Sequence, residues 1–291
     1  MKEFYLVNGN NIKINILEGI HISNNHTIIV HVHGLGSHFQ PVFESLDEFK
    51  NRDKFFSNFN YKSFALEFHG HGKSDGSRCS INSIDDLLDD LDTLVRYLEI
   101  LYNKPIFLFA ESMGCSVALK YCITINNNIK GLIFIAPLFG IDQSLKPNFC
   151  MILILKLISY CFPELSVSAS SKKLSLESTN NKCFLEAKEK NYYSYCGNHK
   201  LNTCRELLNI SNWIEKNGHL LETPILIFHG LKDSITDPKL TEQIFNKIKN
   251  SNKELHLLEE GYHCLLIESE ENPYLPGYIL SKTIKWINDN F

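Results

Sequence analysis

The stretch PIFLFAESMG, residues 105–114, decides the fold of this chain. Pro105 to Ala110 is an apolar run that predicts a buried strand, and Met113 to Ile125 has the spacing of a helix. Ser112 stands where the strand turns directly into the helix. This is the setting of the nucleophile elbow, G-x-S-x-G, with Ala110 in place of the first glycine. A serine before a helix is more often a simple N-cap, so its position after the strand is what favours a nucleophile.

Apolar runs of similar length recur on both sides of this elbow and alternate with helical spacing. Strands are expected at residues 27–33, 63–68, 105–110, 131–136, 224–228 and 255–258, after an edge hairpin that starts the chain. Helices are expected at residues 41–59, 83–101, 113–125, 238–249 and 276–290, the second of them capped by Ser83. Strands that alternate with helices predict an α/β fold, with a mostly parallel sheet and helices on both faces.

The alternation stops between residues 139 and 219, a helix-rich segment without a clear buried strand. We predict that this segment is a helical cap or lid, inserted over the carboxyl ends of the strands, where α/β proteins place their sites. Residues 1–138 and 220–291 would then form the two parts of the core. The longest apolar run, residues 149–162, is too short to span a membrane, which takes about 20 residues.

A nucleophilic serine needs a base, and the base needs an acid that orients it. Asp233 lies in a loop just after a predicted strand, and His263 lies in a loop after the last one. Asp237 is the rival acid, but Asp237-Pro238 is typical of an N-cap followed by proline at the first helical position. The chain order serine, aspartate, histidine is the one expected after such an elbow. We therefore predict Ser112 as nucleophile, His263 as general base and Asp233 as the orienting acid.

The sequence HGLG, residues 33–36, follows the first core strand. A tetrahedral oxyanion needs backbone N–H donors near the nucleophile, and glycines let the backbone approach closely. We predict that the amides of Leu35 and Met113 form this oxyanion hole. A glycine turn without a catalytic role is the alternative.

The composition excludes several classes of partner. A net charge of −4 without a basic stretch argues against a nucleic-acid partner. Nine scattered cysteines without zinc spacing predict reduced, buried thiols. Paired histidines occur at residues 31 and 33 and at residues 69 and 71, but no carboxylate or cysteine stands at ligand spacing, so no metal is predicted. An early acidic residue and the lack of a long apolar segment predict a cytoplasmic protein without signal peptide or transmembrane helix.

Several motifs resemble the monoacylglycerol lipase and lysophospholipase family of α/β-hydrolases, and the resemblance covers most of the chain. They are VHGLGSHF (32–39), EFHGHGKSDG (67–76), AESMGC (110–115), HGLKDSITDP (229–238) and EGYHCLLIE (260–268). KLSLESTNN (173–181) and NYYSYCGNHKLNTCRELL (191–208) are similar to the cap of these lipases. The asparagine-rich composition is similar to that of the versions found in apicomplexan parasites.

The resemblance implies an α/β-hydrolase fold with a helical cap, and a serine hydrolase that needs no cofactor. The expected substrate is a carboxylic ester of a single-chain lipid, a monoacylglycerol or a lysophospholipid, cleaved through an acyl-enzyme. Residues 149–162 would help to form a lid over an acyl tunnel and contact a membrane surface peripherally; a buried cap helix is the alternative. A general carboxylesterase or acyl-protein thioesterase is the second interpretation of the chain, and a catalytically silent binding protein the third. The cap lacks the family's usual arginine and Asp-Pro pair, so the acyl-chain preference does not follow from the resemblance.

Overall fold

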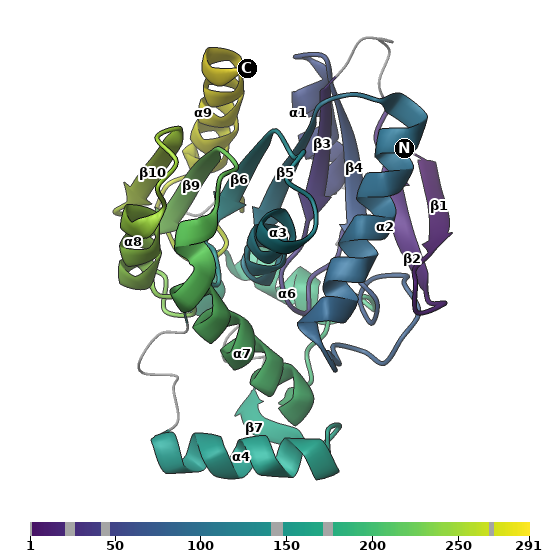
Figure 1. Ribbon diagram of the computed structural model, residues 1–291, viewed down its shortest axis with the longest axis vertical. Coiled ribbons are helices and arrows are strands. Elements are labelled where there is room, and N and C mark those ends of the chain that lie inside the picture. The colour runs from purple at the N-terminus through teal and green to yellow at the C-terminus, as the bar shows by residue number, and fades with distance from the viewer. Residues whose placement is uncertain (1, 21–26, 42–46, 141–147, 171–176, 268–270) are drawn as a thin grey trace.

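The computed structural model describes residues 2–20, 27–41, 47–140, 148–170, 177–267 and 271–291. Eight strands form one sheet in the order β1-β2-β4-β3-β5-β6-β9-β10 (Figure 1). Their bounds are β1 Lys2–Val7, β2 Lys13–Glu18, β3 Thr27–Val32, β4 Tyr61–Glu67, β5 Ile106–Glu111, β6 Gly131–Ile135, β9 Ile225–Gly230 and β10 Lys253–Leu258. The strands from β4 to β10 in this order pair in parallel, while β1 and β2 are antiparallel and complete one edge. The predicted mostly parallel sheet and edge hairpin are confirmed.

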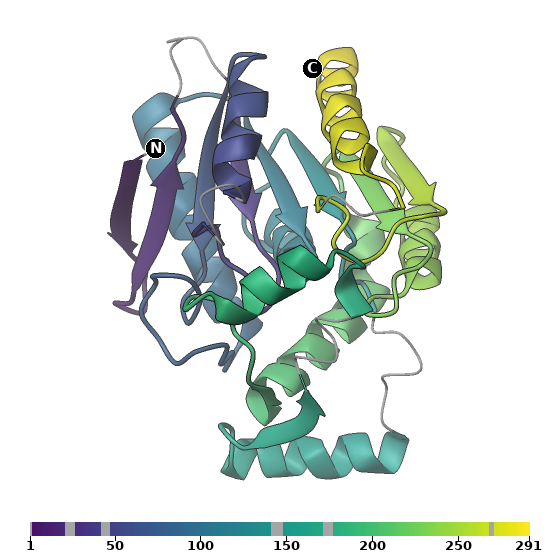
Figure 2. The same cartoon turned by 180° about the vertical axis from the view of Figure 1, so that it is seen from behind.

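Helices cover both faces of the sheet (Figures 1 and 2). One face carries α2 (Ile84–Tyr102), α3 (Met113–Thr124) and α8 (Pro238–Lys247), and the other carries α1 (Glu48–Ser57) and α9 (Leu275–Asn290). Alternate residues of β5 fill the two resulting cores. Leu108 and Ala110 pack with α2 and α3, whereas Phe107 and Phe109 pack with α1 and α9. A strand buried on both faces needs this unbroken apolar sequence.

Side-chain caps set where several helices begin. Ser83 Oγ accepts a hydrogen bond from the amide of Asp85 at 3.1 Å, which starts α2 as predicted. Asp237 caps α8 ahead of its N-terminal proline, which confirms the reading of that pair. Asp47 caps α1, so this helix begins at Glu48, and the expected earlier start at residue 41 falls partly outside the described residues.

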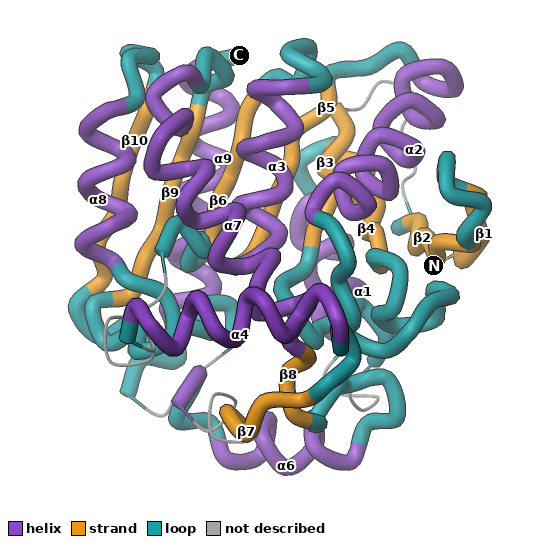
Figure 3. The backbone as a smooth tube through the Cα atoms, turned by 60° about the horizontal axis from the view of Figure 1, so that its bottom comes forward, coloured by secondary structure: helices purple, strands orange, loops and turns teal. Residues whose placement is uncertain are grey.

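The segment between β6 and β9 is helix-rich, as predicted. It contains α4 (Phe149–Cys161), β7 (Ser166–Ser170), α6 (Lys182–Lys190), β8 (Asn198–Lys200), α7 (Leu201–Asn217) and the short helix η2 (Gly218–Leu220). These elements lie at one end of the sheet, and α4 is the outermost, packed against α7 (Figures 1 and 3). The antiparallel pair of β7 and β8 was not predicted, because the strands are short and polar.

Apolar side chains lie on both sides of α4. Ile152 and Leu155 line a cavity that also contains Ser112, whereas Leu157 is 70% exposed and Ile154 is 52% exposed. The alternative of a buried cap helix is therefore wrong. Among the residues that the structure describes, no helix combines the length and apolarity that crossing a membrane requires.

The cysteines divide by location. Cys79, Cys115 and Cys122 are buried, in agreement with the prediction, but Cys161, Cys183 and Cys196 are exposed. All three exposed thiols belong to the segment between β6 and β9. The expectation of buried thiols is wrong for these three.

Candidate active site

Ser112 lies at the turn from β5 to α3. Its φ of 52° and ψ of −118° place a non-glycine residue in a strained region of backbone conformation. The strain is supported on both sides of the residue. Its amide donates to the carbonyl of Ile135 at 3.0 Å, and its carbonyl accepts from the amide of Leu138 at 3.1 Å. The strand–turn–helix context predicted from the sequence is confirmed.

The two small residues of the elbow have different amounts of space. A Cβ added to Gly114 would lie 2.6 Å from the carbonyl oxygen of His33 and 2.7 Å from that of Val32, so only glycine fits. Ala110 is fully buried in β5, and its methyl group belongs to the core. The strand side of the turn therefore accommodates an alanine in place of the first glycine of the motif. The helix side, at Gly114, would not accept one.

The structure brings the three predicted residues into one chain of hydrogen bonds. Ser112 Oγ is 3.0 Å from His263 Nε2, and His263 Nδ1 is 2.7 Å from Asp233 Oδ2. Each residue follows the carboxyl end of a different strand, so a parallel sheet places them at one edge. The arrangement can transfer a proton from the serine hydroxyl to the imidazole.

Asp233 is held in place as an ionised acceptor. Its Oδ1 accepts from the amides of Ile235 at 2.8 Å and Thr236 at 3.0 Å, and its Oδ2 accepts from the Thr236 hydroxyl at 2.7 Å. His229 Nε2 is 3.2 Å from the same oxygen. Burial by itself raises the pKa of Asp233, but the charge of His263 and hydrogen bonds from His229 and His263 outweigh it and hold this pKa well below its usual range.

Thr236 and His229 were not predicted as part of this site. His229 Nδ1 lies 2.9 Å from Thr241 Oγ1, so the ring is fixed from α8 while it faces Asp233. The available signal was the spacing of Asp233 and Thr236, since an aspartate commonly accepts hydrogen bonds from residues two and three positions later.

The proposed oxyanion donors border Ser112. Met113 is the first residue of α3, where amides lack a partner within the helix. A Cβ on Gly34 would lie 2.9 Å from Ser112 Cβ, so the peptide that carries the Leu35 amide passes directly beside the serine. In the described part of the chain, neither the Leu35 nor the Met113 amide donates a hydrogen bond to another protein group.

A cavity of about 460 Å³ lies between this edge of the sheet and the segment that follows β6. Ser112 and His263 belong to its wall, as do residues of α4, α6 and α7. Its size is that of a small-molecule site. Most of the wall is apolar, and the residues that make it so include Leu35, Leu138, Ile152, Leu155, Leu207 and Leu208.

A polar cluster forms another part of the cavity wall, and the sequence analysis missed it. Arg52 of α1 is buried, and its guanidinium pairs with Glu48 at 2.9 Å and with Glu111, the residue before Ser112. Burial raises the pKa of Glu48, although the charge of Arg52 opposes this. Lys188 of α6 lines the cavity near these groups. The spacing of Glu48 and Arg52, four residues apart on a helix, was the one available signal.

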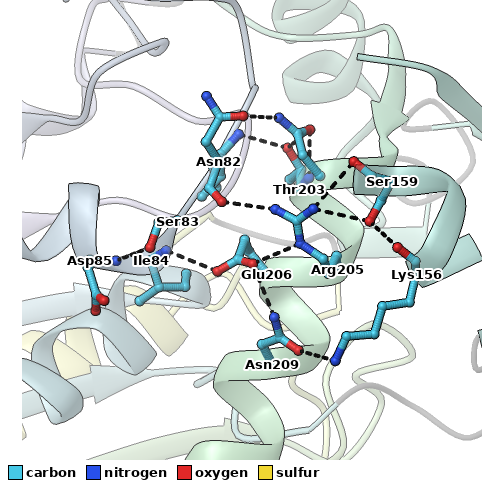
Figure 4. Close-up of polar contacts among 12 residues, drawn as sticks. Asn82, Ser83, Ile84, Asp85, Lys156, Ser159, Thr203, Arg205, Glu206 and Asn209 are labelled. Carbon is cyan, nitrogen blue, oxygen red and sulfur yellow. Dashed lines mark hydrogen bonds and ion pairs between the residues drawn. The ribbon is translucent and has the colours of Figure 1, made fainter. Parts of the chain in front are cut away.

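Polar contacts tie α7 to the core and to α4 (Figure 4). Arg205 donates to the carbonyl of Asn82 at 3.0 Å, to Ser159 Oγ at 3.1 Å and to Glu206 Oε1 at 3.0 Å. Glu206 Oε2 accepts in turn from the amide of Ile84 at 3.2 Å. One arginine therefore joins the beginning of α2 to the outermost helix. None of these residues was predicted, since the contacts join segments far apart in the sequence.

The paired histidines of the sequence have other partners than a metal. His31 is enclosed by the rings of phenylalanines, among them Phe49 and Phe109, and His69 pairs with Asp90 at 2.8 Å. Within the described ranges, no three or more His, Cys, Asp or Glu side chains are grouped so that they could hold a metal ion.

A family model described as "Serine aminopeptidase, S33" matches residues 23–270. The chain belongs to this family. It is 28% identical to caffeoylshikimate esterase of Arabidopsis thaliana, an alignment that covers 88% of this chain and 76% of that protein. It is 23% identical to monoglyceride lipase of Rattus norvegicus, over 88% of this chain and 80% of that protein.

The fold agrees with this family. A monoglyceride lipase of Saccharomyces cerevisiae, solved as a soluble variant with a substrate analogue, superposes with a TM-score of 0.81 at 18% identity, over 99% of this chain and 94% of that one. The predicted α/β-hydrolase fold and the resemblance to the monoacylglycerol lipase group are both confirmed. This member of the family is a hydrolase of the esterase and lipase type.

Proposed function

We propose that the protein is a serine hydrolase that cleaves carboxylic esters of single-chain lipids, with a monoacylglycerol or a lysophospholipid as substrate. The observation that carries the proposal is the hydrogen-bonded series from Ser112 through His263 to Asp233 in the wall of a largely apolar cavity. A dead relative would have little reason to keep all three groups in contact.

The geometry supports the following steps. His263 Nε2 takes the proton of Ser112 Oγ as this oxygen bonds to the ester carbonyl carbon, and the carbonyl electron pair moves onto its oxygen. The amides of Leu35 and Met113 stabilise that oxyanion. Collapse breaks the bond to the alcohol, which leaves with the proton from His263. Water then gives a proton to His263 and attacks the acyl-enzyme, which releases the fatty acid and restores the serine.

The two kinds of cavity wall favour an amphiphilic substrate. Leucine and isoleucine side chains suit an acyl chain, whereas Glu48, Glu111 and Lys188 offer acceptors and donors for a polar head group. Similarity to a caffeoylshikimate esterase and to a monoglyceride lipase supports an ester whose alcohol is polar.

We also propose that residues 139–219 act as a cap over a core made by residues 1–138 and 220–291. Residues of α4, α6 and α7 contribute to the wall of the cavity that contains Ser112, which supports this role. The outward side chains of α4 are apolar and exposed: Met151, Leu153, Ile154, Leu157 and Tyr160. Such a surface suits peripheral contact with a membrane, where lipid substrates are found.

Vesicle sedimentation tests the membrane contact. Leu153→Ser combined with Leu157→Ser should weaken binding to lipid vesicles by about thirtyfold to a thousandfold, because each substitution removes about 1–2 kcal/mol of apolar burial. Ile100→Ser, on α2 and 87% exposed, is the matched control and should bind as the wild type does. Equal binding of all three proteins would remove the membrane proposal.

Labelling with a fluorophosphonate probe tests the catalytic proposal, with Ser112→Ala beside the wild type. Labelling and ester hydrolysis should both be lost in Ser112→Ala. A series of p-nitrophenyl esters from short to long chains then separates the substrates: an optimum at long chains supports a lipase, and one at short chains supports a general carboxylesterase. Faster turnover of an acyl-cysteine peptide would favour a thioesterase. A folded wild type that neither labels nor hydrolyses would be a binding protein.

A further inference from the structure

The peptide bond between Gly34 and Leu35 is anchored through its carbonyl. Gly34 O accepts a hydrogen bond from His33 Nδ1 at 2.7 Å and another from the amide of Ser37 at 3.3 Å. The peptide is trans, so the N–H of Leu35 points away from this carbonyl in the same plane. Whatever holds the Gly34 carbonyl therefore also aims the Leu35 amide.

The tautomer of His33 follows from its other contact. The side chain is buried, and its Nε2 lies 3.1 Å from the amide of Phe68, which can only donate. Nε2 must therefore carry the lone pair, and the ring proton resides on Nδ1, where it is donated to Gly34. Burial lowers the pKa of His33 to about 4, so the ring keeps one donor and one acceptor at neutral pH.

The far end of the same loop is also fixed by a group from β4. The amide of Phe39 donates to Glu67 Oε1 at 2.9 Å, and Glu67 is fully buried. Glu67, the last residue of β4, thus holds the Phe39 end of the loop, and Phe68, the next residue, holds the His33 ring that contacts Gly34 at the other end. Both residues belong to the motif EFHGHGKSDG of residues 67–76. The proposed catalytic steps give this motif no other task.

We propose that His33 is a positioning residue of the oxyanion hole: its Nδ1–H holds the Gly34 carbonyl and thereby directs the Leu35 amide at the oxyanion that forms on Ser112. This inference rests on the proposed function. A buried histidine with a purely structural role would also need hydrogen-bond partners. It would not need to donate its Nδ1–H to the peptide whose N–H is the proposed oxyanion donor.

Two substitutions separate the donor of His33 from its acceptor. In His33→Asn, the side-chain amide nitrogen occupies the place of Nδ1 and can still donate to Gly34. In His33→Gln, the carbonyl oxygen reaches the place of Nε2 and can still accept from Phe68, while the donor to Gly34 is lost. Each variant keeps one buried hydrogen bond and loses the other, so their thermal stabilities should be similar.

Their kinetics should differ. His33→Gln is expected to lower kcat by about tenfold to a hundredfold, because a misdirected oxyanion donor loses much of the 10²- to 10³-fold effect of such a group. Its KM should stay near the wild-type value, since the amide acts on the transition state. His33→Asn should keep kcat within about threefold of the wild type.

Equal loss of kcat in both variants, or wild-type kcat in His33→Gln, would overturn the inference. If neither variant folds, ¹⁵N spectra of the histidine rings in the wild type decide instead: protonated Nδ1 with bare Nε2 at residue 33 supports the inference, and the opposite tautomer refutes it. Hydrolysis that survives Ser112→Ala would remove the proposed function itself. Hydrolysis that depends on Ser112 and is unaffected in His33→Gln would remove this inference alone.

Discussion

The carboxyl edge of the sheet, where Ser112 and Asp233 follow their strands, and the helix α4 both contribute residues around the cavity, but they are held in place differently. Around Ser112 and Asp233, buried backbone amides and side chains hold each group from several sides. Helix α4 packs against α7 and leaves most of its outer apolar side chains exposed. Its polar contacts with α7 include those of Lys156 with Asn209 and of Ser159 with Arg205. The surrounding structure therefore holds Ser112 and Asp233 through more buried hydrogen bonds than it offers the outer side of α4.

The largest expected effect belongs to the carboxyl edge of the sheet. Asp233→Asn should lower kcat by about 10⁴-fold, because an asparagine cannot hold the imidazole in the required tautomer. Steady-state hydrolysis of a p-nitrophenyl ester measures it. Asp237→Ala is the control: it removes the N-cap of α8, should cost about 1 kcal/mol of stability in urea unfolding, and should leave kcat unchanged. A similar loss of kcat in both variants would mean that the rival acid had been wrongly rejected.

The next effect tests how tightly the edge is packed. Gly114→Ala should lower the free energy of unfolding by about 3 kcal/mol or more, because its methyl group would lie 2.6 Å from a backbone oxygen that cannot yield. Ala110→Gly changes the other small residue of the elbow, and should cost only about 1 kcal/mol while activity is kept. Chemical denaturation compares the two, and equal losses would contradict the difference in space described for the elbow.

A smaller and more local effect is expected where α4 is attached. Arg205→Met should remove the hydrogen bond between α7 and Ser159 of α4 and weaken this attachment by about 2 kcal/mol, as expected for hydrogen bonds of a charged group. Hydrogen exchange should then speed up in α4 and remain slow in β5. Arg96→Met removes an exposed ion pair with Asp92 and should change neither. Faster exchange throughout the sheet would show that the two regions are not independent.

The smallest expected effect is a pH dependence of the unfolding free energy that arises from a buried pair in the core. Burial lowers the pKa of His69, but the hydrogen bond and charge of Asp90 outweigh this and raise the pKa above its usual value. The pair therefore stabilises the fold fully below about pH 6.5, and this contribution is lost as the pH rises through the folded pKa. Urea unfolding between pH 6 and 9 should show the loss in the wild type and not in His69→Gln, with exchange in α4 unchanged. The same pH dependence in both proteins would exclude the pair as its source.

Much of the carboxyl edge of the sheet, around Ser112 and Asp233, could be predicted because local sequence determines it. The elbow appears as a buried strand, a serine and a helix in succession, and the choice of Asp233 over Asp237 followed from the proline after Asp237. The structure brings these groups together with His263. Thr236 contacts Asp233 within a single turn, so these supporting hydrogen bonds could also have been predicted from the local sequence.

What could not be predicted depends on long-range contacts. The pairing of Arg52 with Glu111 joins α1 to the elbow, and Arg205 joins segments that are more than a hundred residues apart. The spacing of Arg52 from Glu48 indicates only the pair within α1, and Arg205 has no distinctive local pattern. The position of α4 was equally hidden, because an apolar helix of this length packs inward or faces outward according to the elements around it.

The spacing of the catalytic groups along the chain also has a consequence for synthesis. Ser112 and His263 are separated by 151 residues, and the strands β9 and β10 are made after the elbow. At about 5–20 residues per second, a ribosome needs roughly 8 to 30 s to pass from the nucleophile to its base. During this interval a nascent chain carries Ser112 without the imidazole that lies beside it in the folded protein. The hydrogen-bonded series from Ser112 through His263 to Asp233 can therefore form only after β10 and the loop that follows it have been made.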